Sequence, residues 1–452
     1  MDVLNYLTDF PYTQVLVLGL AKSGTAAARV LHKNGKKVRV NDLKANDDDP
    51  MVRELMDIGI DVITGSHPLD VLDGIQVVVK NPGIPYDNPL IIEAQKQGIP
   101  IITEIELAAL LIDNSIIGIT GSNGKTTTTT LIYEMLKHSG QEATIAGNIG
   151  NVATEVAEKM KKDESMVLEL SSFQLMGIQK FKPRVAVLLN LFEAHLDFHK
   201  TFEQYKEAKA NIFANQSEDD FIVFNYDDSN IVEMVSMAKS KFVPFSTVER
   251  LNDGSWHDDK YLYFKEEPII ALKEIALVGK HNLENIMAAV CAAKLNNATN
   301  EGIYQVLTTF SGVKHRLQFV DNINGRLFYN DSKATNILAT SKALAAFEQP
   351  TILLAGGLDR GNSFDDIIPY LENVKALVVF GETGKKLEDA AVKAGIETIE
   401  HVDNVKNAAI RAYQLSKRDD VILLSPACAS WDQYRNFEER GDMFVAAVHT
   451  LN

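Results

Sequence analysis

The stretch that most constrains this chain is IIGITGSNGKTTTTT, which spans residues 116–130. An apolar run leads into a glycine-rich loop, and an apolar-periodic segment follows the threonines, which predicts a strand, a tight loop and a helix. Backbone N–H groups of such a loop, backed by the positive end of a helix, can surround phosphate oxygens. Lys125 would reach the β- and γ-phosphates, and Thr126 would hold Mg²⁺ through its hydroxyl. The sequence therefore predicts a phosphate-binding loop, with Ile119 at the position of the first glycine of the standard pattern.

A second glycine-rich loop lies near the start of the chain. The run 14–18 predicts a buried strand, GLAKSG (19–24) follows it, and a strand over 37–41 ends at Asp42. This order matches a dinucleotide fingerprint in which Ala21 replaces the second glycine and would crowd a pyrophosphate. Three interpretations stay open: a nicotinamide or flavin site, a Rossmann-like domain that binds another nucleoside diphosphate, or a plain strand-to-helix turn.

A stiff turn follows one of the next strands. Strands are expected over 62–64 and 77–79, and NPGIP (81–85) follows the second of them. Open sheets bind ligands beyond the carboxyl ends of their strands. The turn is therefore a candidate ligand-binding loop, and the first segment closes near Glu104.

Acidic and imidazole side chains follow two strands of the next segment. Glu169 lies near the end of the predicted strand 166–170, where an acid beside a phosphate loop can bind Mg²⁺ directly or through water. His195 and His199 are four residues apart and follow the strand predicted over 185–189. Either they are metal ligands or they are ordinary core or surface histidines, and the pattern leaves both possibilities open.

The remainder of the middle segment offers fewer signals. The helix predicted next carries Lys209, which its periodicity assigns to the solvated surface. Residues 255–272 alternate and contain turn residues, which predicts a small hairpin. A long helix is expected over 279–295, with Asn282 and Asn285 in its first turn, where capping residues belong.

The last third of the chain has the pattern of a mostly parallel sheet. A hairpin is expected around Asn324-Gly325, and strands then alternate with helices. Loops that follow parallel strands gather at one edge of a sheet. Cations and hydroxyls in these loops suit carboxylate and phosphate groups; they are Lys333, Thr335, Arg360 and Ser430.

Composition narrows the class of protein. A length of 452 residues favours about three domains, and a net charge of -16 argues against general affinity for nucleic acid or anionic membranes. Cys291 and Cys428 form no disulfide framework, which favours a reducing compartment. No signal peptide or membrane-spanning run is evident, so we expect a cytoplasmic protein. No pattern predicts a coiled coil, and a monomer is expected.

Several motifs together resemble the ATP-dependent Mur ligases: GSNGKTTT, ELSSFQL, HLD before a YKEAK helix, GKHNLEN, HR before a hairpin, DSKATN and SPACASWDQYRNFEERG. The resemblance extends from Gly19 to Gly441. It implies an α/β protein of three domains. These would be a Rossmann-like UDP-substrate-binding domain (1–105), a central P-loop ATPase-like domain that binds ATP (106–312) and a Rossmann-like C-terminal domain for the incoming amino acid (313–452).

The resemblance also implies roles for individual residues. The catalytic residues would be Lys125, Glu169, His195 and Lys209. Lys209 matches the family's carbamylated lysine, a modification that would turn this cation into a carboxylate-like metal ligand. The metal, Mg²⁺ or Mn²⁺, would be bound by Thr126, Glu169, His195 and carbamylated Lys209. The implied ATP-binding residues are Gly121, Ser122, Asn123, Gly124, Lys125, Thr126, Thr127, Asn282, Asn285, Arg316 and Asp331. Those for the UDP-linked substrate are Leu20, Ala21, Lys22, Ser23, Asp42, Lys44, Asn81, Gly83 and Asn148. Those for D-glutamate are Lys333, Thr335, Arg360, Ser430 and Phe437.

The implied activity is ATP-dependent amide formation through an acyl phosphate, with release of ADP and phosphate. ELSSFQL and DSKATN point, within the family, to addition of D-glutamate to UDP-N-acetylmuramoyl-L-alanine in peptidoglycan precursor synthesis. Alternatives are a sister ligase or folylpolyglutamate-type ligase with another substrate, a nicotinamide-dependent oxidoreductase, and a nucleotide-binding regulator without catalysis. Two positions depart from the family: Ala194 replaces an acid, and Arg360 replaces, slightly displaced, a lysine that some members use on the glutamate carboxylate.

Overall fold

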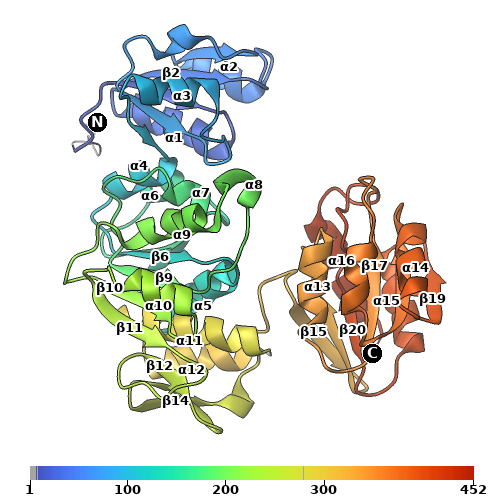
Figure 1. Cartoon of the computed structure of the whole chain (residues 1–452). Coiled ribbons are helices and arrows are strands. Elements are labelled where there is room, and N and C mark those ends of the chain that lie inside the picture. Colours follow the sequence, from blue (N-terminus) through green and yellow to red (C-terminus); the bar gives the residue numbers. More distant parts are fainter. Residues whose placement is uncertain (1–6, 8, 278, 452) are drawn as a thin grey trace. The chain divides into compact units, whose positions relative to one another are not determined.

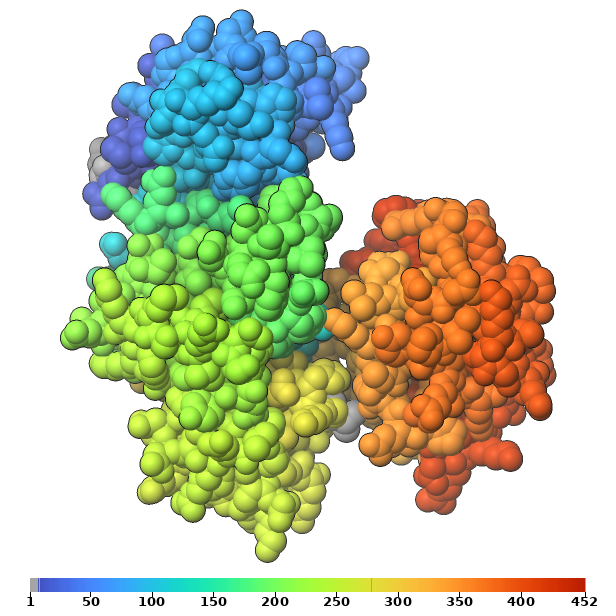
Figure 2. Space-filling model, in the orientation of Figure 1, coloured from blue at the N-terminus to red at the C-terminus, as the bar shows by residue number. Residues whose placement is uncertain are grey.

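Three separate sheets flanked by helices make up the chain (Figure 1). The structure is a computed structural model, and it describes Leu7, residues 9–277 and residues 279–451. The strands are largely buried. The space-filling view shows the outer surface of the same chain in the same colours (Figure 2). The expected α/β fold with three sheets is therefore found.

The chain forms two compact units. One consists of Met1–Ile275 with His281–Leu307, and the other of Ala276–Lys280 with Thr308–Asn452. The first unit contains the N-terminal and the central sheet, and the second contains the C-terminal sheet. The exact boundaries between the three predicted domains stay predictions.

The N-terminal sheet has five parallel strands in the order β3-β2-β1-β4-β5, the doubly wound arrangement. Its elements are β1 (Gln14–Leu18), α1 (Lys22–Lys33), β2 (Lys37–Asp42), α2 (Pro50–Asp57), β3 (Asp61–Thr64), the 3₁₀ turn η1 (Leu69–Leu72), β4 (Val77–Lys80), α3 (Pro89–Lys96) and β5 (Ile101–Ile102). The strand order reverses between β1 and β4, so the loops that follow these two strands meet at the point where such sheets bind ligands. The strands predicted here from the sequence are confirmed.

The central sheet has nine strands in the order β14-β13-β12-β11-β10-β9-β6-β8-β7, parallel except for the pairings β12–β13 and β13–β14. Its strands are β6 (Ile116–Thr120), β7 (Ala143–Gly147), β8 (Ser165–Glu169), β9 (Val185–Leu188), β10 (Phe221–Asn225), β11 (Lys241–Phe245), β12 (Ser255–His257), β13 (Tyr261–Phe264) and β14 (Glu267–Ala271). The last three lie where one hairpin was predicted, so the antiparallel edge is one strand wider than expected.

The helices around this sheet include the one that begins at the phosphate loop. They are α4 (Glu104–Leu110), α5 (Lys125–His138), α6 (Ala153–Ala157), α7 (Ser172–Leu175), α8 (Leu196–His199), α9 (Phe202–Ala210), α10 (Ser229–Val235), α11 (Lys280–Leu295) and α12 (Asn300–Thr309), with the 3₁₀ turns η2 (Asn211–Phe213) and η3 (Leu272–Glu274). The predicted strand, loop and helix around the phosphate loop are confirmed as β6 and α5.

The C-terminal sheet has six strands in the order β15-β16-β20-β17-β18-β19, and β15 alone is antiparallel. Its elements are β15 (Gln318–Ile323), β16 (Arg326–Asn330), α13 (Ile337–Leu344), β17 (Thr351–Gly356), the 3₁₀ turn η4 (Asp365–Tyr370), β18 (Val374–Phe380), α14 (Gly384–Lys393), β19 (Thr398–His401), α15 (Val405–Leu415), β20 (Val421–Leu424) and α16 (Phe437–Val448). β16, β20 and β17 are neighbours, so the loops that follow them share one edge.

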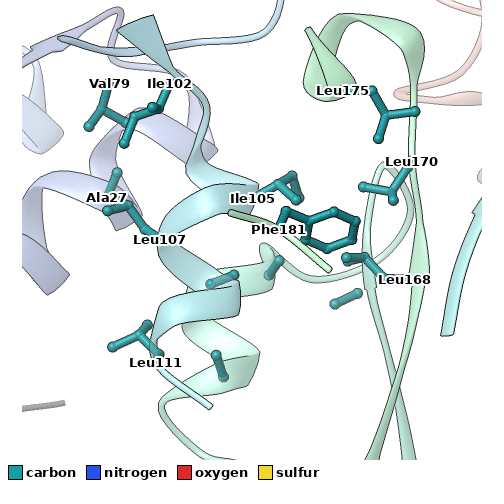
Figure 3. Packing of buried hydrophobic residues seen from close by; sticks show 14 of the residues in the cluster. Ala27, Val79, Ile102, Ile105, Leu107, Leu111, Leu168, Leu170, Leu175 and Phe181 are labelled. Atoms are coloured by element: carbon teal, nitrogen blue, oxygen red, sulfur yellow. The ribbon is translucent and has the colours of Figure 1, made fainter. Parts of the chain in front are cut away.

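Helix α4 joins the first two sheets through a common hydrophobic core. Its Leu107 belongs to one cluster with Ala27 of the N-terminal sheet's helix layer, and its Ile105 to the same cluster with Phe181 and Leu170 of the central domain (Figure 3). The helix therefore buries apolar side chains toward both sheets at once.

Buried acids strengthen this junction. The Glu106 carboxylate accepts three backbone N–H groups, from Gln179, Lys180 and Phe181, at 2.7–3.0 Å. Glu104 accepts the N–H of Thr154 at 2.5 Å, and burial raises the pKa of Glu104 to about 7. In the part of the chain that the structure describes, no helix is long and apolar enough to cross a membrane.

Candidate active site

The phosphate loop between β6 and α5 is fixed by the segment that follows β9. The N–H of Ser122 donates to the Asn190 carbonyl at 2.9 Å, and the N–H of Asn123 donates to Asn190 Oδ1 at 2.8 Å. Gly124 has φ 83°, and a Cβ there would lie 2.1 Å from Asn285 Oδ1. Only glycine fits this position, because a side chain would be strained and would collide with the asparagine.

Two lysines converge on this loop. Lys125 Nζ and Lys209 Nζ both donate to the Gly121 carbonyl, at 2.8 and 2.9 Å, and Lys209 also donates to Thr120 Oγ1 at 3.2 Å. Lys209 is 1% exposed, so its prediction as a solvated charge was wrong: the inner face of α9, with Tyr205, packs against the loop. Burial, and then the charge of Lys125, hold the pKa of Lys209 well below its usual value.

Glu169 ends β8 beside this loop and is 1% exposed. Its Oε1 accepts Asn148 Nδ2 at 2.8 Å, while its Oε2 is buried with no hydrogen-bond partner among the described residues. A buried carboxylate oxygen without a partner is costly, and it is the kind of ligand that Mg²⁺ prefers. Within the described ranges, no group of three His, Cys, Asp or Glu side chains is arranged so that it could hold a metal ion by itself. A Mg²⁺ here would therefore depend on Glu169 with hydroxyl and phosphate oxygens, which its orphaned oxygen and the buried Thr126 at the start of α5 allow.

The two histidines have different surroundings. His199 is 2% exposed, its Nε2 lies 2.9 Å from Ser172 Oγ, and burial lowers its pKa to about 4, so it is a core histidine. His195 is exposed just before α8 and has φ 55°, a conformation that is uncommon outside glycine. Partial burial and the charge of Lys125 lower its pKa, and the nearby Lys209 charge acts in the same direction. His195 is thus kept neutral, the form that can bind a metal.

Asn282 and Asn285 lie inside α11, past its first residue Lys280, and both are buried. Asn285 Oδ1 accepts from Thr128 Oγ1 at 3.5 Å and is the atom that faces Gly124. The structure therefore brings Asn285 against the phosphate loop, although sequence spacing alone gave no ligand role to either asparagine.

The residues predicted for the UDP-linked substrate, except Asn148, lie at the ends of β1, β2 and β4 or in the segments that follow them, on both sides of the β1/β4 switch point. Asp42 Oδ2 accepts the N–H of Leu20 at 2.7 Å, and its Oδ1 accepts those of Lys44 and Ala45. Burial alone would raise the pKa of Asp42, but these three hydrogen bonds hold it below its usual value. The carboxylate is thus occupied with shaping the loop. Asn148 lies instead beside the Glu169 carboxylate, to which its Nδ2 donates.

The turn after β4 is shaped by a residue that the sequence analysis did not select. Lys80 is 1% exposed, and its Nζ donates to the carbonyls of Asn81, Pro82 and Ile84. Asn81 then reaches across the switch point, with Nδ2 donating to Ser23 Oγ at 3.0 Å. A cation at the end of an otherwise apolar strand, VVVK, was the available signal.

In the second unit, the predicted D-glutamate residues follow β16, β17 and β20. Thr335 and Arg360 line a cavity of about 380 Å³ together with residues 427–429. Lys333 lies with its Nζ 5.3 Å from the centre of the Phe437 ring. Ser430 is buried and directly follows the cavity-lining residues in sequence.

Arg440 ties these loops together, and the sequence analysis missed it. Its side chain is fully buried and donates to Ser332 Oγ (3.0 Å) and to the carbonyls of Ser332 (2.8 Å), Cys428 (3.1 Å) and Gly356 (3.4 Å). Burial lowers its pKa to about 10, so it stays charged at neutral pH. Its position in the NFEERG motif was visible, but nothing in that motif distinguished a buried arginine from a solvated one.

Two residues predicted for ATP lie in the second unit. Asp331 is 7% exposed and accepts from Ser425 Oγ at 2.9 Å and from the N–H of Leu317 at 3.1 Å. Burial raises the pKa of Asp331 to about 7. Arg316 is exposed, and a contribution of these two residues to ATP binding stays a prediction.

Comparison with known protein families gives three matches along the chain. Residues 13–103 match the Mur ligase MurD-like N-terminal domain, residues 119–293 the Mur ligase middle domain and residues 315–428 the Mur ligase glutamate ligase domain. The curated UDP-N-acetylmuramoylalanine--D-glutamate ligase of Oceanobacillus iheyensis is 60% identical over 448 residues, which are 99% of this chain and 100% of that protein. The chain belongs to the Mur ligase family.

Further relatives agree with this Mur ligase assignment. The protein of the same name from Geobacillus kaustophilus is 58% identical over 98% of each chain. The crystal structure of MurF ligase from Thermotoga maritima in complex with ADP has the same fold, with a TM-score of 0.57 over the full length of both chains at 17% identity. The predicted three-domain Mur ligase fold is thereby confirmed.

Proposed function

We propose that this Mur ligase joins D-glutamate to UDP-N-acetylmuramoyl-L-alanine at the expense of ATP, which makes it an enzyme of peptidoglycan precursor synthesis. The observation that carries the proposal is 60% identity over the whole length of a curated ligase with this reaction in its name. The phosphate loop with its two converging lysines is the matching chemical feature. We also propose that the protein works in the cytoplasm as a monomer.

A carboxylate is a poor electrophile, so amide formation requires its activation. The terminal alanine carboxylate would attack the γ-phosphate of ATP, forming an acyl phosphate and releasing ADP. The loop N–H groups and Lys125 would hold the phosphates and offset the charge that develops during transfer. The amine of D-glutamate then attacks the acyl carbon, and phosphate leaves as the amide forms.

A divalent cation would assist this transfer. Thr126, Glu169 and His195 are the residues that would hold Mg²⁺, and Glu169 would supply the oxygen that has no hydrogen-bond partner in the part of the chain that the structure describes. Once bound, Mg²⁺ supplies positive charge to the phosphate oxygens. ATP with Mg²⁺, or Mn²⁺ in its place, is therefore the cofactor set that we propose.

The environment of Lys209 supports its carbamylation. An uncharged amine is the form that adds to CO₂, and burial next to Lys125 favours that form. If both lysines were charged, they would repel each other, because their Nζ atoms share the Gly121 carbonyl. A carbamate on Lys209 would instead attract the Lys125 cation. Carbamylation would thus turn an unfavourable pair into a favourable one.

Phosphate release from Mg-ATP and UDP-N-acetylmuramoyl-L-alanine, with D-glutamate, L-glutamate or no amino acid, tests the reaction. We expect release with D-glutamate only. Release with another amino acid would replace the proposed substrate with that of a sister ligase, and a folate acceptor would identify a folylpolyglutamate-type ligase. NAD(P)H binding is the corresponding check on the oxidoreductase alternative, and ATP binding without release would favour a regulator.

Lys125→Ala should abolish phosphate release while leaving the fold intact, because the side chain interacts with loop carbonyls at the surface of the phosphate site. Lys137→Ala, at the exposed far end of the same helix, is the matched control and should keep wild-type turnover. Near-normal turnover of Lys125→Ala would contradict the assignment of this loop.

A further inference from the structure

The cavity of the second unit has a single charged residue in its wall. Its lining residues are Thr335, Asn336, Ile337, Leu338, Leu358, Arg360, Asn362 and residues 427–429. Arg360 is the one cation among them, and no carboxylate lines the cavity. A volume of about 380 Å³ suits a small molecule. The wall therefore offers one strong point of attraction, and it is for an anion.

The Arg360 guanidinium forms no ion pair with an acidic residue among the described residues. The adjacent Asp359 carboxylate is occupied instead by Lys386 Nζ at 2.8 Å and by the N–H of Gly361 at 2.8 Å. Lys386 thus neutralises the nearest acid and leaves Arg360 available for a ligand.

Trp431 is the side chain that contacts this guanidinium. The Arg360 guanidinium carbon lies 5.1 Å from the centre of the indole ring, within cation–π range. Trp431 is 65% exposed, although it directly follows the buried Ser430. An exposed tryptophan beside a cavity contributes little to the hydrophobic core. The contact of the Trp431 ring with the Arg360 guanidinium is therefore the interaction to explain.

A ring contact of this kind fits arginine better than lysine. Guanidinium stacks on aromatic faces and still has N–H groups at its edge, which match a carboxylate in a bidentate arrangement. A free arginine side chain also loses rotamer entropy when a ligand orders it, and contact with a ring reduces that loss at the moment of binding. The stack and the carboxylate can therefore be accommodated together.

We propose that Trp431 is a positioning residue that holds the Arg360 guanidinium at the cavity wall, where it binds one carboxylate of the incoming amino acid. The proposal rests on the proposed ligase function and adds a residue to it. The indole does not touch the reacting atoms; it orders the cation that does the binding. Removal of the indole should weaken the binding of the amino acid and leave the binding of ATP and of the UDP-linked substrate unchanged.

The test compares Trp431→Ala, Trp431→Phe and Arg360→Ala in the full chain by phosphate release. We expect Trp431→Ala to raise the KM for D-glutamate about two- to fivefold, with the KM for ATP unchanged, which is the size of a cation–π contact at an exposed site. Trp431→Phe keeps an aromatic face and should recover most of the loss. Trp256→Phe, at the buried tryptophan of the first unit, is the matched control and should leave the KM for D-glutamate unchanged.

A double-mutant cycle separates positioning from a merely structural effect. If the indole acts through Arg360, Trp431→Ala should have no further effect on the KM for D-glutamate in an Arg360→Ala background. An equal rise in both backgrounds, or an unchanged KM in Trp431→Ala alone, would overturn the proposal. Wild-type protein without D-glutamate-dependent phosphate release would instead overturn the ligase function itself.

D-Glutamine as a competitor identifies the carboxylate. It retains the α-carboxylate but lacks charge on its side chain. If Trp431→Ala weakens inhibition by D-glutamine as much as it raises the KM for D-glutamate, Arg360 binds the α-carboxylate. If inhibition by D-glutamine is unchanged, Arg360 binds the side-chain carboxylate. Each result supports the proposal and assigns one end of the substrate.

Discussion

Lys209 in the first unit and Arg440 in the second are both buried basic residues, and neither forms an ion pair with a carboxylate among the described residues, yet their surroundings differ. Arg440 donates to four acceptors in three loops and keeps its charge, with a pKa of about 10. Lys209 has two acceptors, shares one of them with Lys125, and has its pKa held well below the usual value. Arg440 thus remains a charged donor to several acceptors, whereas the neutral amine form of Lys209 is favoured.

The acceptors make the same distinction. If Lys209 were removed, the Gly121 carbonyl would keep Lys125 as a donor, and Thr120 Oγ1 would keep its own bond to the Leu170 carbonyl. If Arg440 were removed, buried carbonyls in three loops would lose a donor. The first change should therefore cost activity and the second should cost stability.

Lys209→Met should give the largest effect, a loss of turnover on the order of 10³-fold, because the proposed carbamate on Lys209 would help to hold the metal, whose charge would stabilise phosphoryl transfer by several kcal/mol. Its unfolding free energy should be unchanged or slightly higher, since an apolar side chain replaces a desolvated amine. Phosphate release and urea unfolding measure the two quantities. Lys206→Met, on the same helix but partly exposed, should alter neither; equal losses in both variants would break the distinction.

Arg440→Met should lower the unfolding free energy of the second unit by about 3 kcal/mol or more, because several buried carbonyls lose their donor. The chain has two tryptophans, Trp256 in the first unit and Trp431 in the second. In a Trp256→Phe background, fluorescence therefore reports the second unit alone. Arg435→Lys, at an exposed arginine shortly before α16, is the control. An Arg440→Met variant with the same unfolding free energy as its parent would contradict a stabilising role for Arg440.

The sequence predicted the strands and the loops that bear the site, but not which cations are buried. Apolar runs and glycine positions fixed β6, α5 and the loops after β16, β17 and β20, because these signals are local. Lys209 was assigned to the surface because helical periodicity cannot reveal that the phosphate loop packs on that face. Arg440 went unnoticed for the same reason: its acceptors come from residues about 12 to 108 positions away.

Removal of dissolved CO₂ tests whether the Lys209 amine is carbamylated. We expect turnover at pH 7 to fall several-fold when CO₂ and bicarbonate are removed and to recover when bicarbonate is returned. The loss should grow at lower pH, because a protonated Lys209 amine does not react with CO₂. Turnover measured across pH in degassed and in bicarbonate buffer tests this. Turnover that does not depend on bicarbonate at any pH would contradict the carbamylation of Lys209.

The last effect is the pH dependence of stability that Asp331 causes in the second unit. Asp331 directly precedes Ser332, whose carbonyl accepts from Arg440. Burial raises the pKa of Asp331 from 3.8 to about 7, so between these values the folded state binds more protons than the unfolded state. Asp331 therefore makes the second unit less stable as pH rises from about 4 to 7, by on the order of 1 to 3 kcal/mol. Lys209, with its lowered pKa, makes the first unit more stable as pH rises toward 10.5. Asp331→Asn should flatten the acid-side slope of the second unit in urea unfolding at several pH values, and an unaltered slope would contradict its assignment to this carboxyl.

The junction around α4 has a consequence for attempts to divide the protein. Thr103 and Glu104, which precede the predicted boundary, donate to or accept from residues of the central domain: Thr103 Oγ1 bonds the Gln174 carbonyl at 2.7 Å, and Glu104 accepts from Thr154. Cutting the chain at residue 105 would separate the Glu104 carboxyl, which is buried in the intact chain, from its donor Thr154, and it would expose backbone groups on the other fragment. The N-terminal sheet should therefore express poorly by itself, and a soluble fragment should need to run through the central domain as one piece.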